Sequence, residues 1–243
     1  MPPDRVVYDA VLDAAGDVAR ADNALEAELL ASAMLGSVYA MAETDRLLMV
    51  REFVGNFLAG TARRRSAVAV AVRAAFAALV PDAPGAGEVA PGPQAPPWVG
   101  QLGRVRPTGA YAYGDVYGDQ TSYLVTFAYE KDAGGPEHVV VVLVDHNLGA
   151  VKDLFVGSAT EVVAQARQLC ASDDLVWFED SVPVERVRAE VDRHLAYTDS
   201  LEVLPPEDSL AEDRAVVGAR LALLPAGDGG PAPDDAPDRL DDA

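Results

Sequence analysis

The feature that most constrains the fold is a change in the spacing of the apolar residues along the chain. From Arg5 to Val80 they recur every three or four positions, whereas in 123–129 they follow a period of two. The first spacing is typical of an amphipathic helix and the second of a strand. The segment 81–97 between them is dense in Pro and Gly and has little to bury, so we expect an extended linker there. The sequence therefore predicts an α+β fold.

Four runs of helical spacing, joined by short links, predict a small helical bundle over 1–80. The third run starts behind Thr44, a possible N-cap, and the fourth starts at about Ser66. The fourth run, 67–80, is the most apolar segment of the chain. It is shorter than the roughly 20 residues that a bilayer span needs, and it carries Arg73 at its centre. We therefore predict a buried helix there.

The second half of the chain predicts a small antiparallel sheet. Three successive apolar segments, 123–129, 139–144 and 151–156, are separated by turn-forming residues and pair most simply as a meander. The segment 98–117 is expected to add one or two edge strands.

Three further helices are predicted after these strands. Ser158 and Glu161 have the spacing of a capping box, Pro183 suits the first turn of a second helix, and Asp208 or Ser209 can open a third. We expect these C-terminal helices to cover the sheet.

These patterns divide the chain into four predicted segments. They are a helical domain over 1–80, a Pro/Gly-rich linker over 81–97, an α+β domain over 98–224 and a tail over 225–243. The tail has no apolar periodicity and carries six Asp against one Arg, so we expect a disordered acidic terminus.

The charge balance limits the partners that the protein can bind. The chain has 19 basic and 39 acidic residues, a formal net charge of -20, which repels nucleic-acid phosphates and anionic lipid surfaces. We expect neither nucleic-acid nor membrane binding. A single cysteine, Cys170, forms no intramolecular disulfide, and the charged residues in Met1 to Val11 do not match a secretory signal. Both observations favour a cytoplasmic protein.

The strongest candidate for chemistry is Asp145-His146 at the end of the second predicted strand, with Asp153 on the next. In a functional interpretation, Asp145 and Asp153 act as bases or magnesium ligands and His146 assists proton transfer. In a structural interpretation, Asp145 pairs with Lys152 across a tight hairpin. Asp153 then still needs a partner, which a helix N-terminus or an arginine could supply.

Tyrosines gather before and within the first predicted strand. Tyr113-Gly-Asp repeats almost at once as Tyr117-Gly-Asp, and Tyr111 lies close by. Such a cluster could form a recognition surface, because Tyr has a rigid apolar body with a polar tip. Alternatively, the same Tyr and Gly residues simply make a twisted strand and turn at the edge of the sheet.

No metal site or cofactor is predicted. The chain has three histidines, and His138 and His146 bracket one predicted strand, which puts them more than about 20 Å apart. A magnesium site that uses only Asp145 and Asp153 has no recognisable ligand spacing to support it. Phosphate-binding glycine loops, the GxSxG elbow and the HExxH motif are all absent from the sequence.

These observations favour a non-enzymatic interaction or regulatory protein of the cytoplasm. The acidic charge suggests a basic protein partner, whose identity and stoichiometry the sequence does not indicate. The alternative is a carboxylate-dependent hydrolase, with or without magnesium, whose site is at Asp145, His146 and Asp153.

Overall fold

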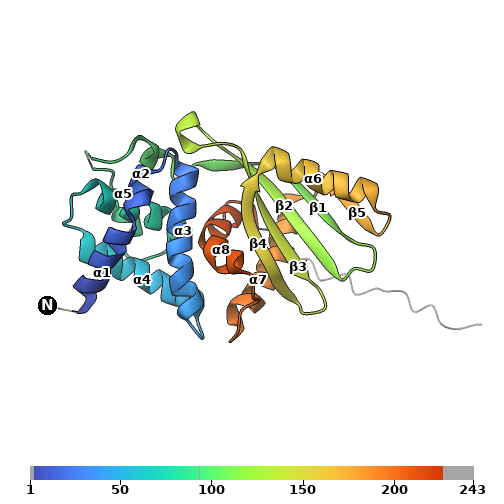
Figure 1. Cartoon of the computed structure of the whole chain (residues 1–243), viewed down its shortest axis with the longest axis horizontal. Coiled ribbons are helices and arrows are strands. Elements are labelled where there is room, and N and C mark those ends of the chain that lie inside the picture. Colours follow the sequence, from blue (N-terminus) through green and yellow to red (C-terminus); the bar gives the residue numbers. More distant parts are fainter. Residues whose placement is uncertain (1–2, 93, 227–243) are drawn as a thin grey trace, which may run out of the picture.

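The computed structural model describes residues 3–92 and 94–226, and this part of the chain has an α+β fold (Figure 1). It contains eight α-helices and one five-stranded antiparallel sheet. Five N-terminal helices form one layer, two C-terminal helices pack between that layer and the sheet, and one helix covers the other face of the sheet. The predicted fold class is confirmed.

The N-terminal helices pack around a cluster of aromatic rings. They are α1 (Pro3–Ala14), α2 (Gly16–Arg20), α3 (Ala24–Met41), α4 (Arg46–Thr61) and α5 (Ala67–Leu79). The buried ring of Phe57 lies 5.7 Å from the ring of Tyr8 and 5.2 Å from that of Phe76. The first predicted run is interrupted by a turn at Ala15, which separates α1 from α2.

One predicted helix start is confirmed and one is wrong. Ser66 caps α5, because its hydroxyl accepts a hydrogen bond from the N–H of Ala69 at 3.3 Å. Thr44 does not cap α4. Instead Asp45 precedes the helix with a φ of 50° and makes no side-chain cap bond. The buried guanidinium of Arg46 holds this corner by donating to four backbone carbonyls.

Helix α3 lies at the centre of the helical layer. Among the described residues it is the one helix long and apolar enough to cross a membrane by length and composition alone. Half of this helix is buried, and α8, α4 and α5 pack against it. Its apolar composition therefore matches its place in the protein core.

The Pro/Gly-rich segment 81–97 differs from the expected extended linker, because part of it packs against the helices. Ala83 is buried, and Pro84 lies so close to Gly55 of α4 that a Cβ on Gly55 would be 2.8 Å from the proline ring. The small side chain of Ala83 and the ring of Pro84 therefore fit against the helices. The segment contains the 3₁₀ turn η1 (Ala86–Glu88), and a second one, η2 (Pro97–Gln101), begins at its last residue. The buried Trp98 in the second donates to a carbonyl between α2 and α3 at 2.9 Å.

The sheet contains the predicted meander and one unpredicted strand. Its strands are β1 (Val105–Asp115), β2 (Gln120–Tyr129), β3 (His138–Asp145), β4 (Ala150–Ser158) and β5 (Val176–Asp180). The spatial order is β4-β3-β2-β1-β5, and all neighbours are antiparallel. The segment 98–117 was expected to lie at the edge of the sheet, but β1 is an inner strand because β5 pairs with its outer side.

Different helices cover the two faces of the sheet. These helices are α6 (Ala159–Ser172), α7 (Val184–Ser200) and α8 (Asp208–Leu221). Helix α6 covers one face over a small separate apolar cluster, while α7 and α8 cover the other and join the main core. Ser158 precedes α6 as predicted, but its side chain makes no capping bond, so the predicted capping box is not formed.

The C-terminal helices also cover the outer edge of β4. The N–H of Val151 donates to the hydroxyl of Thr198 in α7 at 2.8 Å, and the N–H of Val156 donates to the carboxylate of Asp213 in α8 at 2.9 Å. Side chains therefore occupy backbone donors that another strand would otherwise use.

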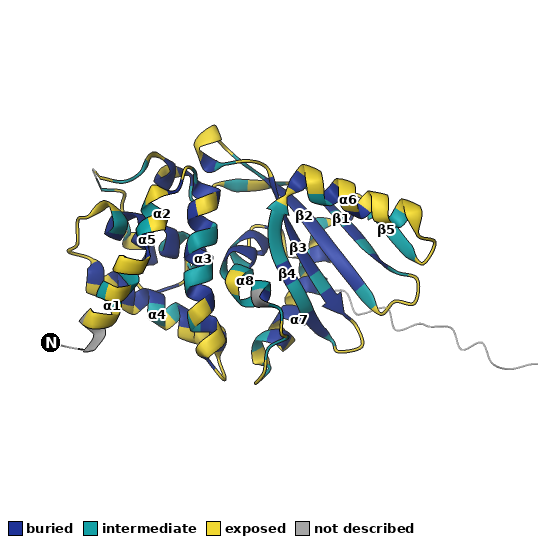
Figure 2. Cartoon of the chain, viewed as in Figure 1, coloured by how far each residue is buried: buried dark blue, intermediate teal, exposed yellow. Residues whose placement is uncertain are grey.

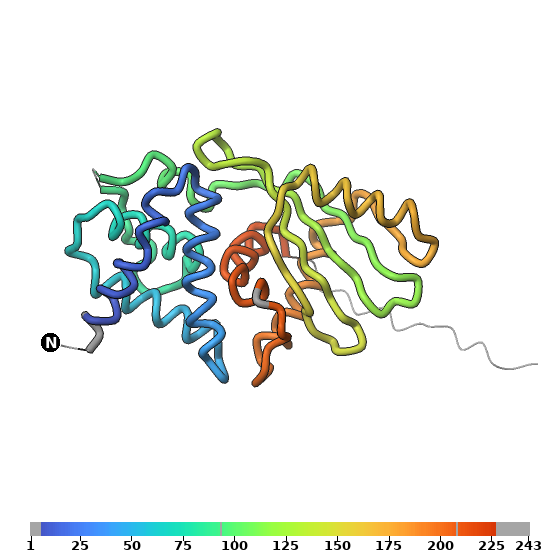
Figure 3. Tube along the Cα trace, in the orientation of Figure 1, coloured from blue at the N-terminus to red at the C-terminus, as the bar shows by residue number. Residues whose placement is uncertain are grey.

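The two halves of the chain pack together through α3 and α8, which lie side by side although they are far apart in sequence (Figure 3). The hydroxyl of Ser32 donates to the carbonyl of Glu212 at 2.6 Å and accepts from the N–H of Val216 at 3.1 Å. Gly36 allows the close approach of the helices, since a Cβ there would lie 2.4 Å from the carbonyl oxygen of Ala211. The acidic tail lies outside the described residues from position 227 onward.

A buried polar network connects α8 to both the helical layer and the sheet. Arg220 and Glu28 are fully buried and form an ion pair, and Arg220 also donates to the hydroxyl of Tyr129 at 2.8 Å. The Tyr129 hydroxyl donates in turn to Glu28, whose other oxygen accepts from the N–H of Gly103 at 2.7 Å. Each carboxylate oxygen thus has a partner, as a buried charge requires.

His138 completes this network as a neutral ring. Its Nε2 accepts from Nε of Arg220 at 3.1 Å, and Nδ1 lies 3.4 Å from the carbonyl of Pro136. An arginine only donates, so Nε2 of His138 carries no proton. Burial, and then the charge of Arg220, lower the pKa of His138 to about 4.

We expect Gly36→Ala to lower the free energy of unfolding by about 1–3 kcal/mol, because the added methyl group forces α3 and α8 apart. The control is Gly87→Ala in η1, where a Cβ would meet no atom within 4 Å. Urea unfolding of both variants measures the difference. An equal effect of the two substitutions would contradict the close approach of the two helices.

We expect His138→Gln to reduce the pH dependence of stability between pH 7.5 and 5.5. An unfolded histidine has a pKa of about 6.5, so as the pH falls the unfolded chain takes up a proton that the folded chain excludes. The wild-type protein should therefore lose about 1 kcal/mol more than the variant over this range. Urea unfolding of both proteins at the two pH values tests this prediction. If the wild type and His138→Gln lose the same free energy of unfolding between pH 7.5 and 5.5, the prediction is wrong.

Candidate functional site

Three loops that carry several of the predicted site residues lie at one end of the sheet. They are the β1–β2 turn, the β3–β4 turn and the loop between α6 and β5. We call the surface made by 115–119, 145–149 and 172–175 the loop-end surface. In Figure 1 it is the end of the sheet at which β1 meets β2 and β3 meets β4.

The β3–β4 turn is built around Asp145. One oxygen of its carboxylate accepts from the N–H of Leu148 at 3.0 Å, and the other lies 3.4 Å from the side-chain amide of Gln120. The proposed ion pair with Lys152 is not among the ion pairs of the described residues. A β-bulge shifts the register so that Ala150 lies opposite Asp145. Asp145 accepts a hydrogen bond within the turn, so its partner is a backbone N–H and not the lysine that the structural interpretation expected.

His146 is exposed and contacts the neighbouring strand and α7. Its Nε2 lies 3.0 Å from the hydroxyl of Thr121, and its ring centroid lies 5.6 Å from that of His194. Partial burial of the ring, and then the neighbouring His194, lower the pKa of His146. The proximity of these two histidines was not predicted, since they are distant in sequence.

The β1–β2 turn is organised by Asp115. Its carboxylate accepts from the N–H groups of Tyr117, Asp119 and Gln120 at 2.9, 3.1 and 2.6 Å. These bonds, that of Asp119 most strongly, hold the pKa of Asp115 below its usual value. The side-chain amide of Asn147 donates to Asp119 at 3.0 Å, which joins this turn to the β3–β4 turn.

The loop before β5 adjoins the β1–β2 turn. Asp173 accepts from the N–H of Leu175 at 2.9 Å, and the carbonyl of Leu175 accepts from the N–H of Val116 at 2.9 Å. The indole of Trp177 also donates to the carbonyl of Asp115 at 3.0 Å. Hydrogen bonds thus connect the three loops into one surface.

The loop-end surface combines exposed apolar side chains with acidic charge. Val116, Tyr117, Leu148 and Leu175 are 52, 72, 63 and 52% exposed. The three segments contain five aspartates and no lysine or arginine. Figure 2 shows the exposed residues at these turns beside the buried strands. Large exposed apolar side chains that lie close together are typical of an interaction site.

The other predicted site residues lie outside the loop-end surface. Asp153 accepts a hydrogen bond from the hydroxyl of Ser209, in the first turn of α8, so the expected partner is a helix N-terminal side chain. Tyr111 and Tyr113 pack against the small apolar cluster under α6. The Tyr111 ring centroid lies 5.4 Å from the guanidinium carbon of Arg167. Of the three candidate tyrosines, only Tyr117 is on the loop-end surface.

The described residues contain no group of three or more His, Cys, Asp or Glu side chains arranged to hold a metal ion. His138 and His146 lie at opposite ends of β3, and each contacts different neighbours.

The comparisons identify no relative. No protein-family model matches the chain, and neither a curated protein nor a solved structure matches it.

We expect Asp145→Ala to lower the free energy of unfolding by about 1 kcal/mol, because the N–H of Leu148 loses its acceptor. Lys152→Ala should change stability by less than about 0.5 kcal/mol, because it forms no ion pair with Asp145. Denaturant unfolding of the two variants decides the matter. If Lys152→Ala lowers the free energy of unfolding as much as Asp145→Ala does, Asp145 and Lys152 form a cross-strand ion pair after all.

Proposed function

We propose that this chain is a non-enzymatic interaction protein that binds a basic protein partner through the loop-end surface. The observation that carries the proposal is the composition of that surface. Four exposed apolar side chains lie on three hydrogen-bonded loops that hold five aspartates and no lysine or arginine.

The apolar and acidic groups have different roles in this proposal. Apolar and aromatic side chains such as Tyr117 supply binding energy when a partner covers them. The aspartates increase the association rate with a basic surface and oppose binding of an acidic one. The net charge of -20 acts in the same direction over long distances.

The geometry of the loops supports tight binding. Asp115, Asp145 and Asp173 each accept at least one backbone N–H bond within their own loop. Such bonds hold the loops in a defined shape before a partner arrives, so less conformational entropy is lost on binding.

The test is native affinity purification with mass spectrometry at moderate and high salt. We expect a stoichiometric basic partner that Tyr117→Ser loses and that Asp174→Lys binds more weakly. Val203→Ser and Glu43→Lys are the matched controls, because both residues are exposed and lie outside the loop-end surface. Each control should retain the partner.

Two outcomes would contradict the proposal. A partner that remains bound to Tyr117→Ser and Asp174→Lys uses another surface. A partner lost from a chain that ends at Leu224, but kept by both loop variants, depends on the acidic tail instead. Circular dichroism of each variant confirms that its fold is intact.

A further inference from the structure

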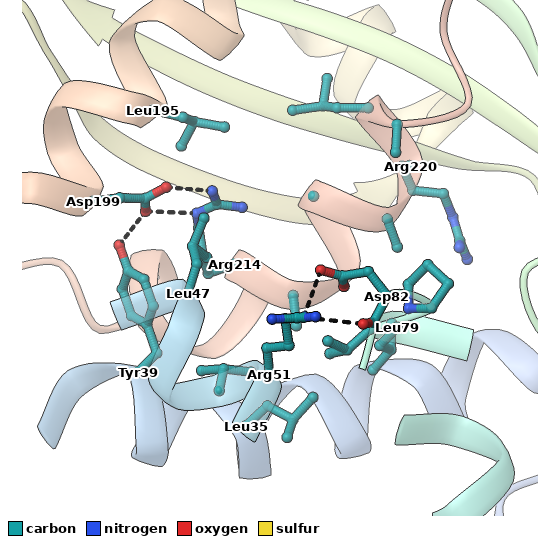
Figure 4. Close-up of a pocket in the computed structure, with 18 of the residues that line it drawn as sticks. Leu35, Tyr39, Leu47, Arg51, Leu79, Asp82, Leu195, Asp199, Arg214 and Arg220 are labelled. Carbon is teal, nitrogen blue, oxygen red and sulfur yellow. Dashed lines mark hydrogen bonds and ion pairs between the residues drawn. The ribbon is translucent and has the colours of Figure 1, made fainter. Parts of the chain in front are cut away.

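A second candidate site lies between the helical layer and the C-terminal helices. It is a cavity of about 830 Å³ bounded by α3, α4 and α5 on one side and by α7 and α8 on the other (Figure 4). Leu35, Val50, Leu79 and Leu195 contribute to a wall that is mostly apolar. This volume is in the range of small-molecule sites, which are typically about 300–1,000 Å³. The cavity shares no residue with the loop-end surface.

The amino acids of α8 explain why the space exists. Ala211, Ala215, Gly218 and Ala219 line the cavity, and each has a methyl group or less as its side chain. The opposing helices cannot close this gap, because Gly36 of α3 already approaches the α8 backbone as closely as a Cβ-free residue allows. The cavity is therefore a consequence of how α3 and α8 meet.

The charged groups at the left of Figure 4 neutralise one another. Arg214 binds both oxygens of Asp199, at 2.9 and 2.6 Å, and the hydroxyl of Tyr39 donates to the same carboxylate at 2.6 Å. Arg214 and Asp199 are only 10 and 11% exposed, and burial, and then Asp199, raise the pKa of Tyr39. The phenol thus remains protonated.

The other charges around the cavity are also paired. Arg51 reaches from α4 to Asp82, with Nε 3.0 Å from its carbonyl and 3.2 Å from its carboxylate. Arg188 pairs with Asp192 at 3.1 Å, and the Arg220 side chain is bound within the buried network. A charged ligand would find no unpaired opposite charge here, and its desolvation would be uncompensated.

One side chain in this otherwise paired wall, Arg51, has donors available. Arg51 uses Nε for Asp82, and in the described part of the chain its two terminal nitrogens donate no hydrogen bond. Arg51 is labelled near the centre of Figure 4, among the apolar side chains. An uncharged oxygen of a ligand can accept from it without leaving a buried charge unpaired.

We propose that the cavity binds a neutral, largely apolar small molecule with one hydrogen-bond acceptor, of the class of long-chain alcohols and ketones. The apolar wall supplies the binding energy, and Arg51 orients the polar end. Because the charges of the wall are already paired, fatty acids and amines of the same length should bind more weakly.

The full chain is titrated with the neutral fluorescent probe N-phenyl-1-naphthylamine, which is then displaced with 1-dodecanol, dodecanoate or dodecylamine. We expect the probe to bind and the alcohol to displace it. Dodecanoate and dodecylamine should compete at least about tenfold more weakly, because each brings an unpaired charge. Equal competition by either charged compound would overturn the assigned ligand class.

Matched variants locate the binding. Leu47 lines the cavity and its neighbour Leu48 does not, although they are 49 and 46% exposed. Leu47→Gln should raise the Kd of the probe about tenfold, and Leu48→Gln should leave it unchanged. Both residues are half exposed, so neither substitution should unfold the protein.

A second pair of variants tests whether filling the cavity with a large side chain blocks binding of the probe. Ala196 of α7 lines the cavity, while Ala189, two turns earlier on the same helix, does not, and both are exposed. Ala196→Trp should abolish probe binding and Ala189→Trp should retain it. The inference is overturned if the wild-type chain fails to bind the probe, or if Leu47→Gln and Ala196→Trp bind it as the wild type does.

Discussion

The arrangement of the layers depends on the buried ion pair between Glu28 and Arg220. It joins α3 to α8, while Tyr129 and His138 join the same group of side chains to the sheet. A buried pair of this kind adds little net stability, but removal of one partner leaves a charge without compensation. The pair therefore favours one placement of α8 against α3 and the sheet, and with it the cavity beside them.

Sequence reasoning was most accurate where structure depends on local patterns. Helical spacing predicted the N-terminal helices, and three apolar segments predicted the meander. It failed where the outcome depends on distant contacts. The strand β5 has only five residues, too few for a clear period, and it is a strand because β1 pairs with it. Arg46, not Thr44, holds the start of α4, through carbonyls that include those of Leu201 and Glu202, far along the chain.

The candidate sites also divide into features that local patterns predict and features that depend on distant contacts. Asp145, His146 and Tyr117 lie at one end of the sheet because an antiparallel meander brings alternate turns together. Asp153 instead contacts Ser209 of α8, and the register of β3 and β4 places Ala150, not Lys152, opposite Asp145. The cavity had no sequence signal, since its walls come from helices separated by more than half of the chain. In the sequence, the charged residues that line the cavity cannot be told apart from charged residues on the protein surface.

The covered edge of β4 limits how this sheet can grow. Because Thr198 and Asp213 occupy two backbone donors of β4, this edge is partly blocked for strand addition, and β5 forms the other edge among the described strands. A sheet with one usable edge can join a single other edge, and the resulting pair has no free edge left. Edge-to-edge contact between copies of this chain through β5 alone would therefore stop at two and would not extend into an open-ended fibril.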